Sequence, residues 1–462
     1  MMPSSTKKTL WLLGVLSAAI YGMNFRVGDF LVRLGFTNDA PHPISSYLIQ
    51  IMSLGLIYLL ALRVSVRIEK ENERHLTPIL LFAFLFRLPL IPLDSTLSSD
   101  IYRYVWEGKV QVVAGMNPYM FPPSDDQLAF LRDQEIYPHI NRKESPTIYP
   151  PGAQLLFASA HWAGFDTPQE LKALALAADA LTLLLLLLIL RQLRLPLSRI
   201  ITYAWNPLVI YELFYSGHLE SFLLPLLLLF IYLFLRGRVV AAAMALGAAT
   251  AIKLVPVFLL ATLPQGSRSK MFVPFVAVIS LTYLFYLEAG TQVLGFLPSY
   301  FSDPYEVFNL GMVQLGLLEV IKLASLPASS IRFIFFVLFI GTLIAIAHRP
   351  YRSLGDLVRK SYLVLSAYLL LIYPAFHPWY LCLLVPLLCL IPSPAWICFS
   401  LLLPLSYLKY LAPDGTMPVW VIFAQFVPLY ALLIREYFKM NVLNERRFQW
   451  YPGFHTPSSS TL

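Results

Sequence analysis

The chain has little charge for its size, because only 13% of its 462 residues are Asp, Glu, Lys or Arg. Soluble domains carry about 25% charged residues, so the composition argues against an ordinary soluble enzyme. Cysteine is also scarce: Cys382, Cys389 and Cys398 all lie in apolar stretches and match no metal-ligand spacing. The sequence also lacks a Gly-rich phosphate-binding loop and a soluble nucleotide-binding domain, so nothing in it indicates a nucleotide substrate.

Long apolar segments take the place of the missing charge. Hydrophobic residues make up 58% of the chain, and its mean hydropathy is +0.67. A spanning helix needs about 20 mostly apolar residues, and runs of this kind recur at 9–24, 44–62, 77–93, 170–190, 220–235, 271–287, 331–347 and 418–434. Backbone polar groups in lipid must be satisfied within the segment, so the sequence predicts an all-α polytopic membrane protein. We interpret the first run as a spanning helix rather than a removable signal peptide.

Basic residues sort the loops by side, because cytoplasmic loops are enriched in Lys and Arg. We assign to the cytoplasm the segments 1–8, 63–75, 191–199, 236–238, 265–270, 348–360 and 435–462. Together they hold 21 of the 34 basic residues but only 6 of the 26 acidic ones. This asymmetry predicts a multi-pass protein of the cell membrane with both termini in the cytoplasm and the segment 94–147 outside. Because the positive charge is concentrated in the cytoplasmic segments, the basic net charge does not indicate a protein that binds nucleic acid.

The same topology predicts about 12–14 transmembrane helices with outer juxtamembrane helices. Segments 149–165 and 309–326 would be juxtamembrane or re-entrant, and 239–264 would be a tight helical pair with its turn near Lys253. We expect a single transmembrane domain over 1–440 and a cytoplasmic tail over 441–462.

A polar, aromatic-rich island separates the apolar segments: SSDIYRYVWEGKVQVVAGMNPY at 98–119, continued by PTIYPPGAQLLF at 146–157. Ionisable residues at the edge of the hydrocarbon are expensive and are functional by default. Under the predicted topology they fall at the outer ends of helices, which favours one water-filled, outward-facing site. They are Asp100, Arg103, Glu107, His218, Glu220, Lys253 and His377.

Asp100 is the only carboxylate at the start of the island. A general base that takes a proton from a sugar hydroxyl must be a carboxylate or a His within hydrogen-bond reach. The alternative is that Asp100 only caps a juxtamembrane helix, in competition with Ser98 and Ser99. Arg103 could bind a phosphate through its guanidinium, or it could simply pair with Asp100 or Glu107.

Lys253 stands alone between GAATAI and LVPVFLL. It could snorkel to the interface, or it could hold the phosphate of a lipid-linked substrate as a point charge. His218 and Glu220 are two residues apart and could both reach a cavity from a helix-turn boundary, or could only satisfy loop hydrogen bonds. His377, between prolines, could bind phosphate, donate to a sugar or satisfy a backbone carbonyl.

Aromatic side chains of the island, Tyr102, Tyr104 and Trp106, could form an interfacial belt or stack on sugar rings. Asp125 and Asp126 could bind a divalent cation, although acidic residues in a Pro-rich loop are usually just solvated. We therefore predict no metal ligands and leave a divalent cation as the one cofactor still open.

At these residues the chain resembles a known family. DIYRYVWEGKVQVVAGMNPY followed by TIYPPGAQLLF resembles the outer loop of bacterial polyprenol-phosphate-dependent mannosyltransferases, which have the GT-C membrane fold. WNPLVIYELFYSGHLES, AIKLVP and HPWYLCLLVPL resemble their later blocks, in the expected order, so the resemblance spans residues 87 to about 390. Two helices precede the island's own helix, whereas many GT-C members place the acidic loop directly after their first helix.

The resemblance implies a GT-C-type multi-helix bundle that moves a hexose, mannose or a similar sugar, from a polyprenyl-phosphate donor to a glycan or lipid acceptor on the extracytoplasmic face. It implies Asp100 as the base in the extracytoplasmic loop. We expect Arg103, Lys253 and His377 to bind the donor phosphate. We assign sugar or acceptor binding to Tyr102, Tyr104, Trp106, Glu107, Asn117, Tyr119, His218 and Glu220. The alternative is a transporter or flippase of a lipid-linked sugar, against which the sequence shows no internal repeat.

Overall fold

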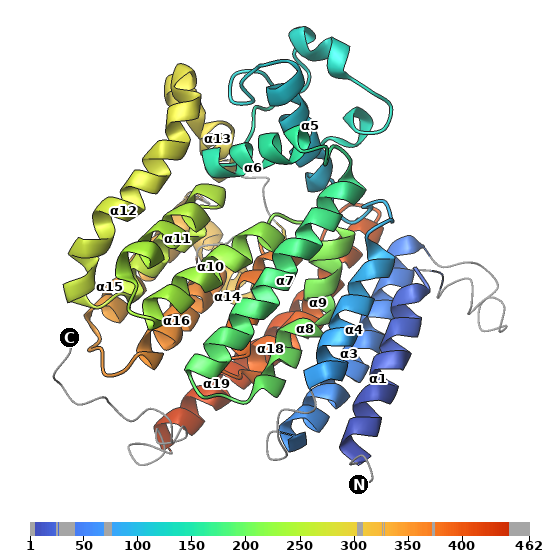
Figure 1. Cartoon of the computed structure of the whole chain (residues 1–462), viewed down its shortest axis with the longest axis vertical. Coiled ribbons are helices and arrows are strands. Elements are labelled where there is room, and N and C mark those ends of the chain that lie inside the picture. The colour runs from blue at the N-terminus through green and yellow to red at the C-terminus, as the bar shows by residue number, and fades with distance from the viewer. Residues whose placement is uncertain are drawn as a thin grey trace. The chain divides into compact units, whose positions relative to one another are not determined.

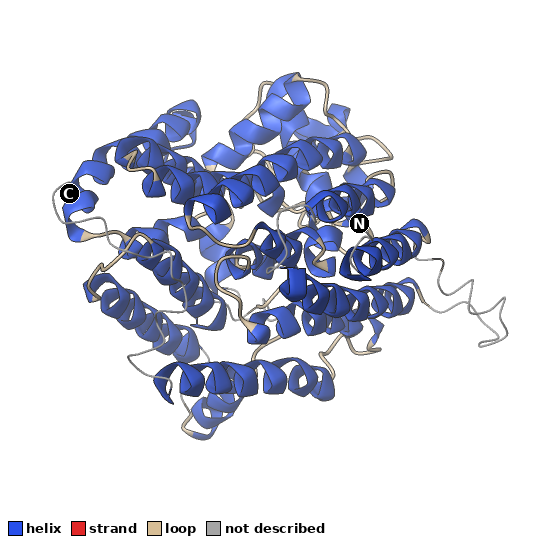
Figure 2. Cartoon of the chain, turned by 60° about the horizontal axis from the view of Figure 1, so that its bottom comes forward, coloured by secondary structure: helices blue, strands red, loops and turns tan. Residues whose placement is uncertain are grey.

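The computed structural model describes residues 5–24, 26, 42–68, 76–302, 308–325, 327, 329–371 and 375–442. Helices and loops make up all of this described part, with no strand in it (Figure 2). The all-α class predicted from hydropathy is therefore confirmed. Segment 69–75 and residues 443–462 of the predicted cytoplasmic tail lie outside the described residues.

Among the described residues, six helical segments are long and apolar enough to cross a membrane: Pro43–Val66, Pro168–Gln192, Gln265–Ser299, Ser330–His348, Pro394–Leu411 and Val419–Lys439. Shorter apolar helices cover Leu76–Leu90, Glu220–Leu235 and Val239–Ile252. The chain is thus a polytopic membrane protein. The shorter helices are tolerated in a membrane where protein packs around them. The total of about 12–14 spans stays a prediction.

The chain divides into two compact units, each discontinuous in sequence. The first comprises 1–89, 186–210 and 307–462, and the second comprises 90–185 and 211–306. One of the boundaries between the units falls inside α7 (Pro168–Gln192). The predicted outer loop, 94–147, belongs entirely to the second unit.

In the first unit, α1 packs against α3 and α4, α15 packs against α16, and α18 packs against α19. Its α-helices are α1 (Ser5–Gly22), α3 (Pro43–Ile68), α4 (Leu76–Arg87), α8 (Ile201–Ala204), α9 (Pro207–Ile210), α14 (Met312–Leu323), α15 (Ser329–His348), α16 (Gly355–Leu371), α17 (Val385–Leu388), α18 (Pro394–Leu402) and α19 (Val419–Val442). Its shorter 3-10 elements are η5 (Leu197–Ile200), η9 (Pro378–Leu383) and η10 (Leu403–Leu411), with η2 (Leu88–Leu90) at the division.

The second unit carries the polar island. Its α-helices are α5 (Asp100–Val113), α6 (Pro151–Trp162), α10 (Glu220–Leu235), α11 (Val239–Ile252), α12 (Gln265–Tyr283) and α13 (Leu297–Ser302). Its other helical elements are η3 (Asp126–Leu131), η4 (Tyr137–His139), the π-helix η6 (Tyr211–Tyr215), η7 (Val255–Thr262) and η8 (Leu284–Leu294). α10, α11 and α12 lie side by side (Figure 1), and α6 contacts α5, α11 and α12.

Local sequence signals set where these helices begin and end. Thr167 and Glu170 form a capping box at the start of α7: Thr167 N donates to Glu170 Oε2 at 3.0 Å, and Glu170 N donates to Thr167 Oγ1 at 3.3 Å. Pro151 starts α6 at a position where its missing N–H costs nothing. Gly152 lets the start of α6 approach α11, since a Cβ there would lie 2.7 Å from Ala251.

The predicted tight pair at 239–264 is confirmed as a break at Lys253. α11 ends at Ile252, Lys253 has an extended backbone (φ −150°, ψ 136°), and η7 follows from Val255. The break lies beside the start of α10, because Lys253 forms an ion pair with Glu220, the first residue of that helix. Segments 149–165 and 309–326 contain α6 and α14, each 12 residues long, as expected for helices too short to span a bilayer.

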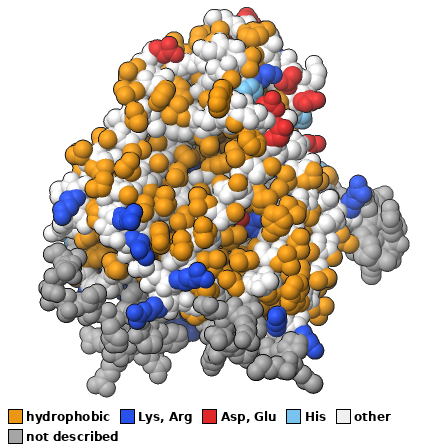
Figure 3. All heavy atoms as spheres, viewed as in Figure 1, with side chains coloured by type: hydrophobic (Ala, Val, Ile, Leu, Met, Phe, Trp, Pro, Cys, Tyr) orange, Lys and Arg blue, Asp and Glu red, His pale blue; other side chains and the backbone are white. Residues whose placement is uncertain are grey.

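The surface of the second unit changes character along the chain. α12 and η8 present large exposed apolar side chains, including Phe272, Val273, Leu281, Phe285 and Leu287 (Figure 3). Acidic side chains gather instead over the segment 94–147, where Asp126, Glu135 and Glu144 are exposed. This contrast is typical of a helix that faces lipid and a loop that faces water.

Candidate functional site

The Asp100 carboxylate lies at the start of α5, where the helix dipole favours a negative charge. Asn141 Nδ2 donates to its Oδ1 at 2.9 Å, and its side chain is 23% exposed. Ser99 occupies the N-cap position without a side-chain cap, whereas Ser98 Oγ accepts from Asp100 N at 3.3 Å. The capping alternative for Asp100 therefore does not describe its carboxylate, which faces Asn141 and His218.

His218 reaches Asp100 through a turn that only glycine allows easily. Gly217 has φ +74°, and a Cβ there would lie 2.3 Å from Ile101 Cδ1, on α5. This close approach places His218 Nδ1 3.7 Å from Asp100 Oδ2. The His218 side chain is fully buried, so Asp100 is the exposed member of this pair.

Glu212 completes a row of three ionisable side chains. It belongs to the π-helix η6, whose wider turn is a common feature of functional sites. Its Oε2 lies 3.4 Å from His218 Nε2, and both side chains are 0% exposed. The backbone supports the same contact, because His218 N donates to Glu212 O at 3.1 Å. The imidazole of His218 thus lies between two carboxylates, those of Asp100 and Glu212.

Lys253 forms an ion pair with Glu220, through Nζ and Oε1. Glu220 starts α10 and is almost fully buried, whereas the Lys253 side chain at the end of α11 is 22% exposed. The charges of Lys253 and Glu220 both act on the carboxyl of Asp100. Four of the ionisable residues singled out from the sequence are therefore brought together in the second unit: Asp100, His218, Glu220 and Lys253. Their separation along the chain reaches 153 positions.

The surroundings of Asp100 raise the pKa of its carboxyl above the ordinary Asp value. Loss of water around the carboxylate is the largest cause. The hydrogen bond from Asn141 and the positive charges of Lys253 and Arg103 act in the opposite direction, and Glu220 raises the pKa further. A carboxylate with a raised pKa is a stronger base once it is ionised, which suits proton abstraction.

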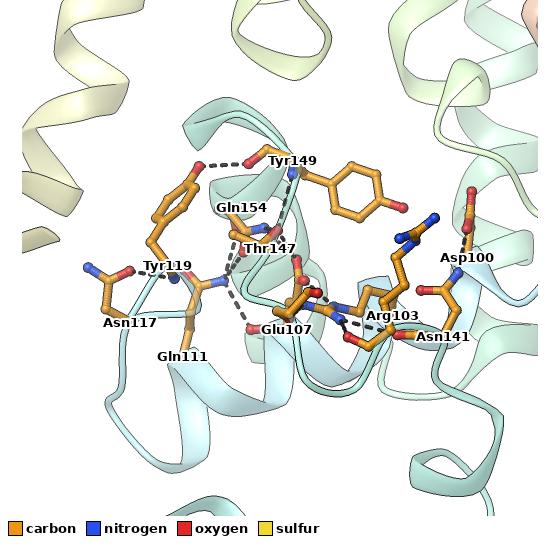
Figure 4. Close-up of polar contacts among 12 residues, drawn as sticks. Asp100, Arg103, Glu107, Gln111, Asn117, Tyr119, Asn141, Thr147, Tyr149 and Gln154 are labelled. Atoms are coloured by element: carbon orange, nitrogen blue, oxygen red, sulfur yellow. Dashed lines mark hydrogen bonds and ion pairs between the residues drawn. The ribbon is translucent and has the colours of Figure 1, made fainter. Parts of the chain in front are cut away.

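Arg103 and Glu107 hold the island loop onto α5 (Figure 4). Arg103 Nε donates to Glu107 Oε1 at 2.5 Å. The other guanidinium nitrogens of Arg103 donate to the carbonyls of Asn141, Arg142 and Ser145. The pairing alternative for Arg103 is thus realised with Glu107, and these contacts fix the segment that carries Asn141.

Glu107 is also the acceptor at the centre of a second cluster. Its Oε2 accepts from Thr147 Oγ1 at 2.8 Å and from Gln154 Nε2 at 2.5 Å. Gln111 extends the cluster: its Nε2 donates to Gln154 Oε1 at 3.0 Å, and its Oε1 accepts from Tyr286 Oη at 2.7 Å. This network ties α5 to α6 and to η8.

The sequence assigns Asn117 and Tyr119 to substrate binding. In the structure they form hydrogen bonds at the end of the segment 98–119. Asn117 Nδ2 donates to Glu288 Oε1 at 3.1 Å, and its Oδ1 accepts from Tyr119 N. Tyr119 Oη donates to the carbonyl of Tyr149 at 2.7 Å. Figure 4 shows the Tyr149 ring between this cluster and Asp100, so Tyr149 is the nearer candidate for a substrate contact.

The aromatic residues of α5 pack against the island rather than stand open. Tyr102 stacks on His139 with 4.8 Å between ring centroids, Tyr104 stacks on Phe157 at 4.8 Å, and Trp106 lies 5.4 Å from Tyr137. All three α5 rings are at most 6% exposed. Their role in binding a sugar stays a prediction.

His377 belongs to the first unit, where its ring stacks on Phe308 and on Trp379 with centroids 4.4 Å apart in each case. Its predicted phosphate contact therefore stays a prediction. Asp125 caps η3, because its Oδ1 accepts from Gln127 N at 2.9 Å, and Asp126 is exposed. Within the described ranges, no group of three or more His, Cys, Asp or Glu residues could hold a metal ion.

Sequence reasoning missed Glu212, Asn141 and Tyr149. Glu212 had a usable signal, since it is a lone carboxylate in the apolar run VIYELFY, and such residues are functional by default. Asn141 had none, because neutral amides are ordinary in polar loops. Tyr149 lies within the motif TIYPPG, but nothing in the sequence tells a ring beside the site from one that only packs.

Comparison with known proteins gives independent information on the family of this chain. Searches of curated proteins and of solved structures gave no match. A family model described as alpha-(1->6)-mannopyranosyltransferase, N-terminal domain, matches residues 9–264. The match covers more than half of the chain and includes Asp100, Glu212, His218, Glu220 and Lys253. This helical membrane chain therefore belongs to the alpha-(1->6)-mannopyranosyltransferase family, a family of glycosyltransferases.

Proposed function

We propose that this protein transfers mannose from a polyprenyl-phosphate donor to a hydroxyl of a glycan or lipid acceptor, with Asp100 as the general base. The observation that carries the proposal is the Asp100 carboxylate itself. It is partly exposed, is held by Asn141, has a raised pKa and lies under the influence of the Lys253–Glu220 ion pair.

In the proposed reaction the acceptor hydroxyl approaches the exposed side of Asp100. The carboxylate takes the hydroxyl proton as the acceptor oxygen bonds to the anomeric carbon. The bond from that carbon to the phosphate oxygen breaks, and its electron pair leaves with the polyprenyl phosphate. A fixed positive charge near the leaving oxygen stabilises the growing negative charge without reorganisation.

Lys253 supplies that charge in the proposal. Its side chain is partly exposed, so its ammonium can contact a phosphate while Glu220 remains its protein partner. Arg103 has a different place, because its guanidinium already donates to Glu107 and to three loop carbonyls. For Arg103 we therefore propose that it positions the loop that carries Asn141, rather than contacting the phosphate.

In this proposal, the distribution of basic residues determines which side of the membrane carries the site. The segment 94–147 lies outside because the basic residues concentrate in the segments assigned to the cytoplasm. The polyprenyl chain of the donor would then lie in the outer leaflet. The exposed apolar side chains of α12 and η8 show that the unit carrying Asp100 also presents a surface suited to lipid.

The test compares Asp100→Asn with Asp126→Asn in purified protein reconstituted in lipid. Asp126 is an exposed carboxylate of the same loop, so its replacement controls for charge alone. Transfer of labelled mannose from polyprenyl-phosphate mannose to an acceptor extract should fall about 10²- to 10⁴-fold in Asp100→Asn. Full activity in a folded Asp100→Asn protein would exclude Asp100 as the base.

The same assay distinguishes a transferase from the alternative, a transporter or flippase. A transporter or flippase would move the lipid-linked sugar between leaflets and would leave the bond from sugar to phosphate intact. Movement of the donor without label transfer, from mannose, glucose and arabinose donors alike, would refute the transferase proposal for this protein. The family match supports the transferase.

A further inference from the structure

His218 and Glu212 form a buried pair behind Asp100 that the proposed chemistry has not yet used. Both side chains are 0% exposed, so neither can touch a substrate. His218 faces Asp100 with Nδ1 at 3.7 Å and Glu212 with Nε2 at 3.4 Å. Any effect of the pair on the reaction must therefore pass through Asp100.

The number of protons on the His218 ring decides how it can face the carboxylates of Asp100 and Glu212. A neutral imidazole carries one N–H, so its other nitrogen would turn a lone pair toward a carboxylate. An imidazolium carries an N–H on both nitrogens and faces both carboxylates favourably. Buried charges are costly unless they are paired, and one cation between two anions pairs both.

Three other charged groups near His218 are Glu220, Lys253 and Lys172. Glu220, at the start of α10, is paired with Lys253. Lys172 of α7 donates to the carbonyls of Leu93 and Tyr215 and lies against Gly217. Lys172 thereby adds a positive charge near the turn, but its hydrogen bonds go to carbonyl groups and not to the carboxylates. The carboxylates of Asp100 and Glu212 face the two imidazole nitrogens, at 3.7 Å and 3.4 Å.

We propose that Glu212 holds His218 as an imidazolium, and that this buried cation keeps Asp100 ionised and oriented for proton abstraction. Glu212 and His218 are thus positioning residues, and Asp100 is the group that meets the acceptor. The proton from the acceptor hydroxyl ends on Asp100, while His218 keeps its two protons throughout. The inference rests on the proposed function, since it assigns a partner to the proposed base.

The sign of the effect follows from the charges. Removing the cation with His218→Asn takes away the positive charge between Asp100 and Glu212, so the pKa of Asp100 rises. The acid limb of the pH profile of kcat should then move to higher pH by roughly one to three pH units. Adding Glu212→Gln to His218→Asn removes the second negative charge near Asp100, so the acid limb should move part of the way back.

A purely structural role does not produce this pattern. If the pair only supported the fold, the single variant would lower yield or kcat at every pH, and the double variant would be worse. An acid limb that stays in place in His218→Asn, or that moves further in the double variant, overturns the inference. Loss of activity in Asp100→Asn with an unmoved limb in His218→Asn would refute this inference alone, whereas full activity in Asp100→Asn would refute the proposed base.

A measurement on the unaltered protein guards against a variant that does not fold. In protein labelled with ¹⁵N histidine, one ring should stay doubly protonated at a pH well above the ordinary histidine pKa, where an exposed imidazole is neutral. Glu212→Asp, which keeps the carboxylate, should retain that signal. Spectra in which every ring loses its proton together with the exposed ones contradict the proposed imidazolium.

Discussion

Replacement of Lys253 should have two separable effects, because the side chain has two partners in our interpretation. Its ion pair with Glu220 is a feature of the structure, and its contact with the donor phosphate is proposed. Breaking a buried ion pair by removing one partner costs about 3–5 kcal/mol. Lys253 is 22% exposed and Glu220 only 1%, so we expect about 3 kcal/mol for Lys253→Ala, near the lower end of that range.

The double variant Lys253→Ala with Glu220→Gln separates the two effects. Without the lysine, Glu220 is a buried and uncompensated carboxylate, and Gln removes that charge at nearly constant volume. The thermal unfolding midpoint, lowered in Lys253→Ala, should return toward that of the unaltered protein. Transfer activity should not return, because a charge-assisted hydrogen bond to phosphate is worth about 2 kcal/mol, or about 30-fold in kcat/KM.

Lys322→Ala is the matched control for this experiment. Lys322 and Glu319 form an ion pair in which both side chains are well exposed, at 59% and 65%. Exposed pairs contribute little, so both the midpoint and the activity should stay close to their original values. The phosphate assignment fails if the double variant regains full kcat/KM for the donor together with its stability.

Three further predictions concern the same unit. Gly217→Ala should lower stability by about 2 kcal/mol, because alanine is strained at φ +74° and its Cβ meets Ile101; an unchanged denaturation midpoint would refute this. Glu107→Gln removes the buried partner of Arg103 and should cost about 3 kcal/mol, with faster proteolysis of the segment 120–145; equal cleavage rates would contradict the clamp. Asp100→Asn should not lower the midpoint at neutral pH. The pKa of Asp100 is raised in the folded protein, chiefly by loss of water, so its ionised form costs stability above that pKa, and a fall of several degrees in the variant would show this reasoning to be wrong.

The sequence was sufficient to predict the class of fold and four of the ionisable residues that the structure groups at the site. Hydropathy gave the helical membrane class because apolar length is a direct consequence of the bilayer. The break at Lys253 was also predictable, since basic residues on both sides of 239–264 required a turn between them. The grouping of Asp100, His218, Glu220 and Lys253 followed from a single physical argument, that ionisable residues near hydrocarbon need a shared polar place.

From the sequence alone, residues that could contact a substrate cannot be distinguished from residues that only fix the loop of the polar island. Arg103 and Glu107 have the composition of a binding site, yet their contacts go to each other, to loop carbonyls and to Thr147 and Gln154. Those partners lie 38 to 47 positions away, and loop pairings over that distance leave no periodic trace. Glu212 could be noticed as a lone carboxylate in an apolar run, but helix periodicity does not predict which face it lies on, because the π-helix η6 changes which side chains share a face.

The turn at Gly217 has a consequence for how relatives of this protein can be recognised. The contact of His218 with both carboxylates depends on a residue that adopts a positive φ and leaves Ile101 undisturbed, and glycine alone meets both conditions without strain. A relative that uses the same row therefore needs a glutamate, four intervening residues, a glycine and a histidine in succession. This short pattern, combined with an aspartate at the start of the preceding polar island, turns a backbone angle into a search criterion that hydropathy alone cannot supply.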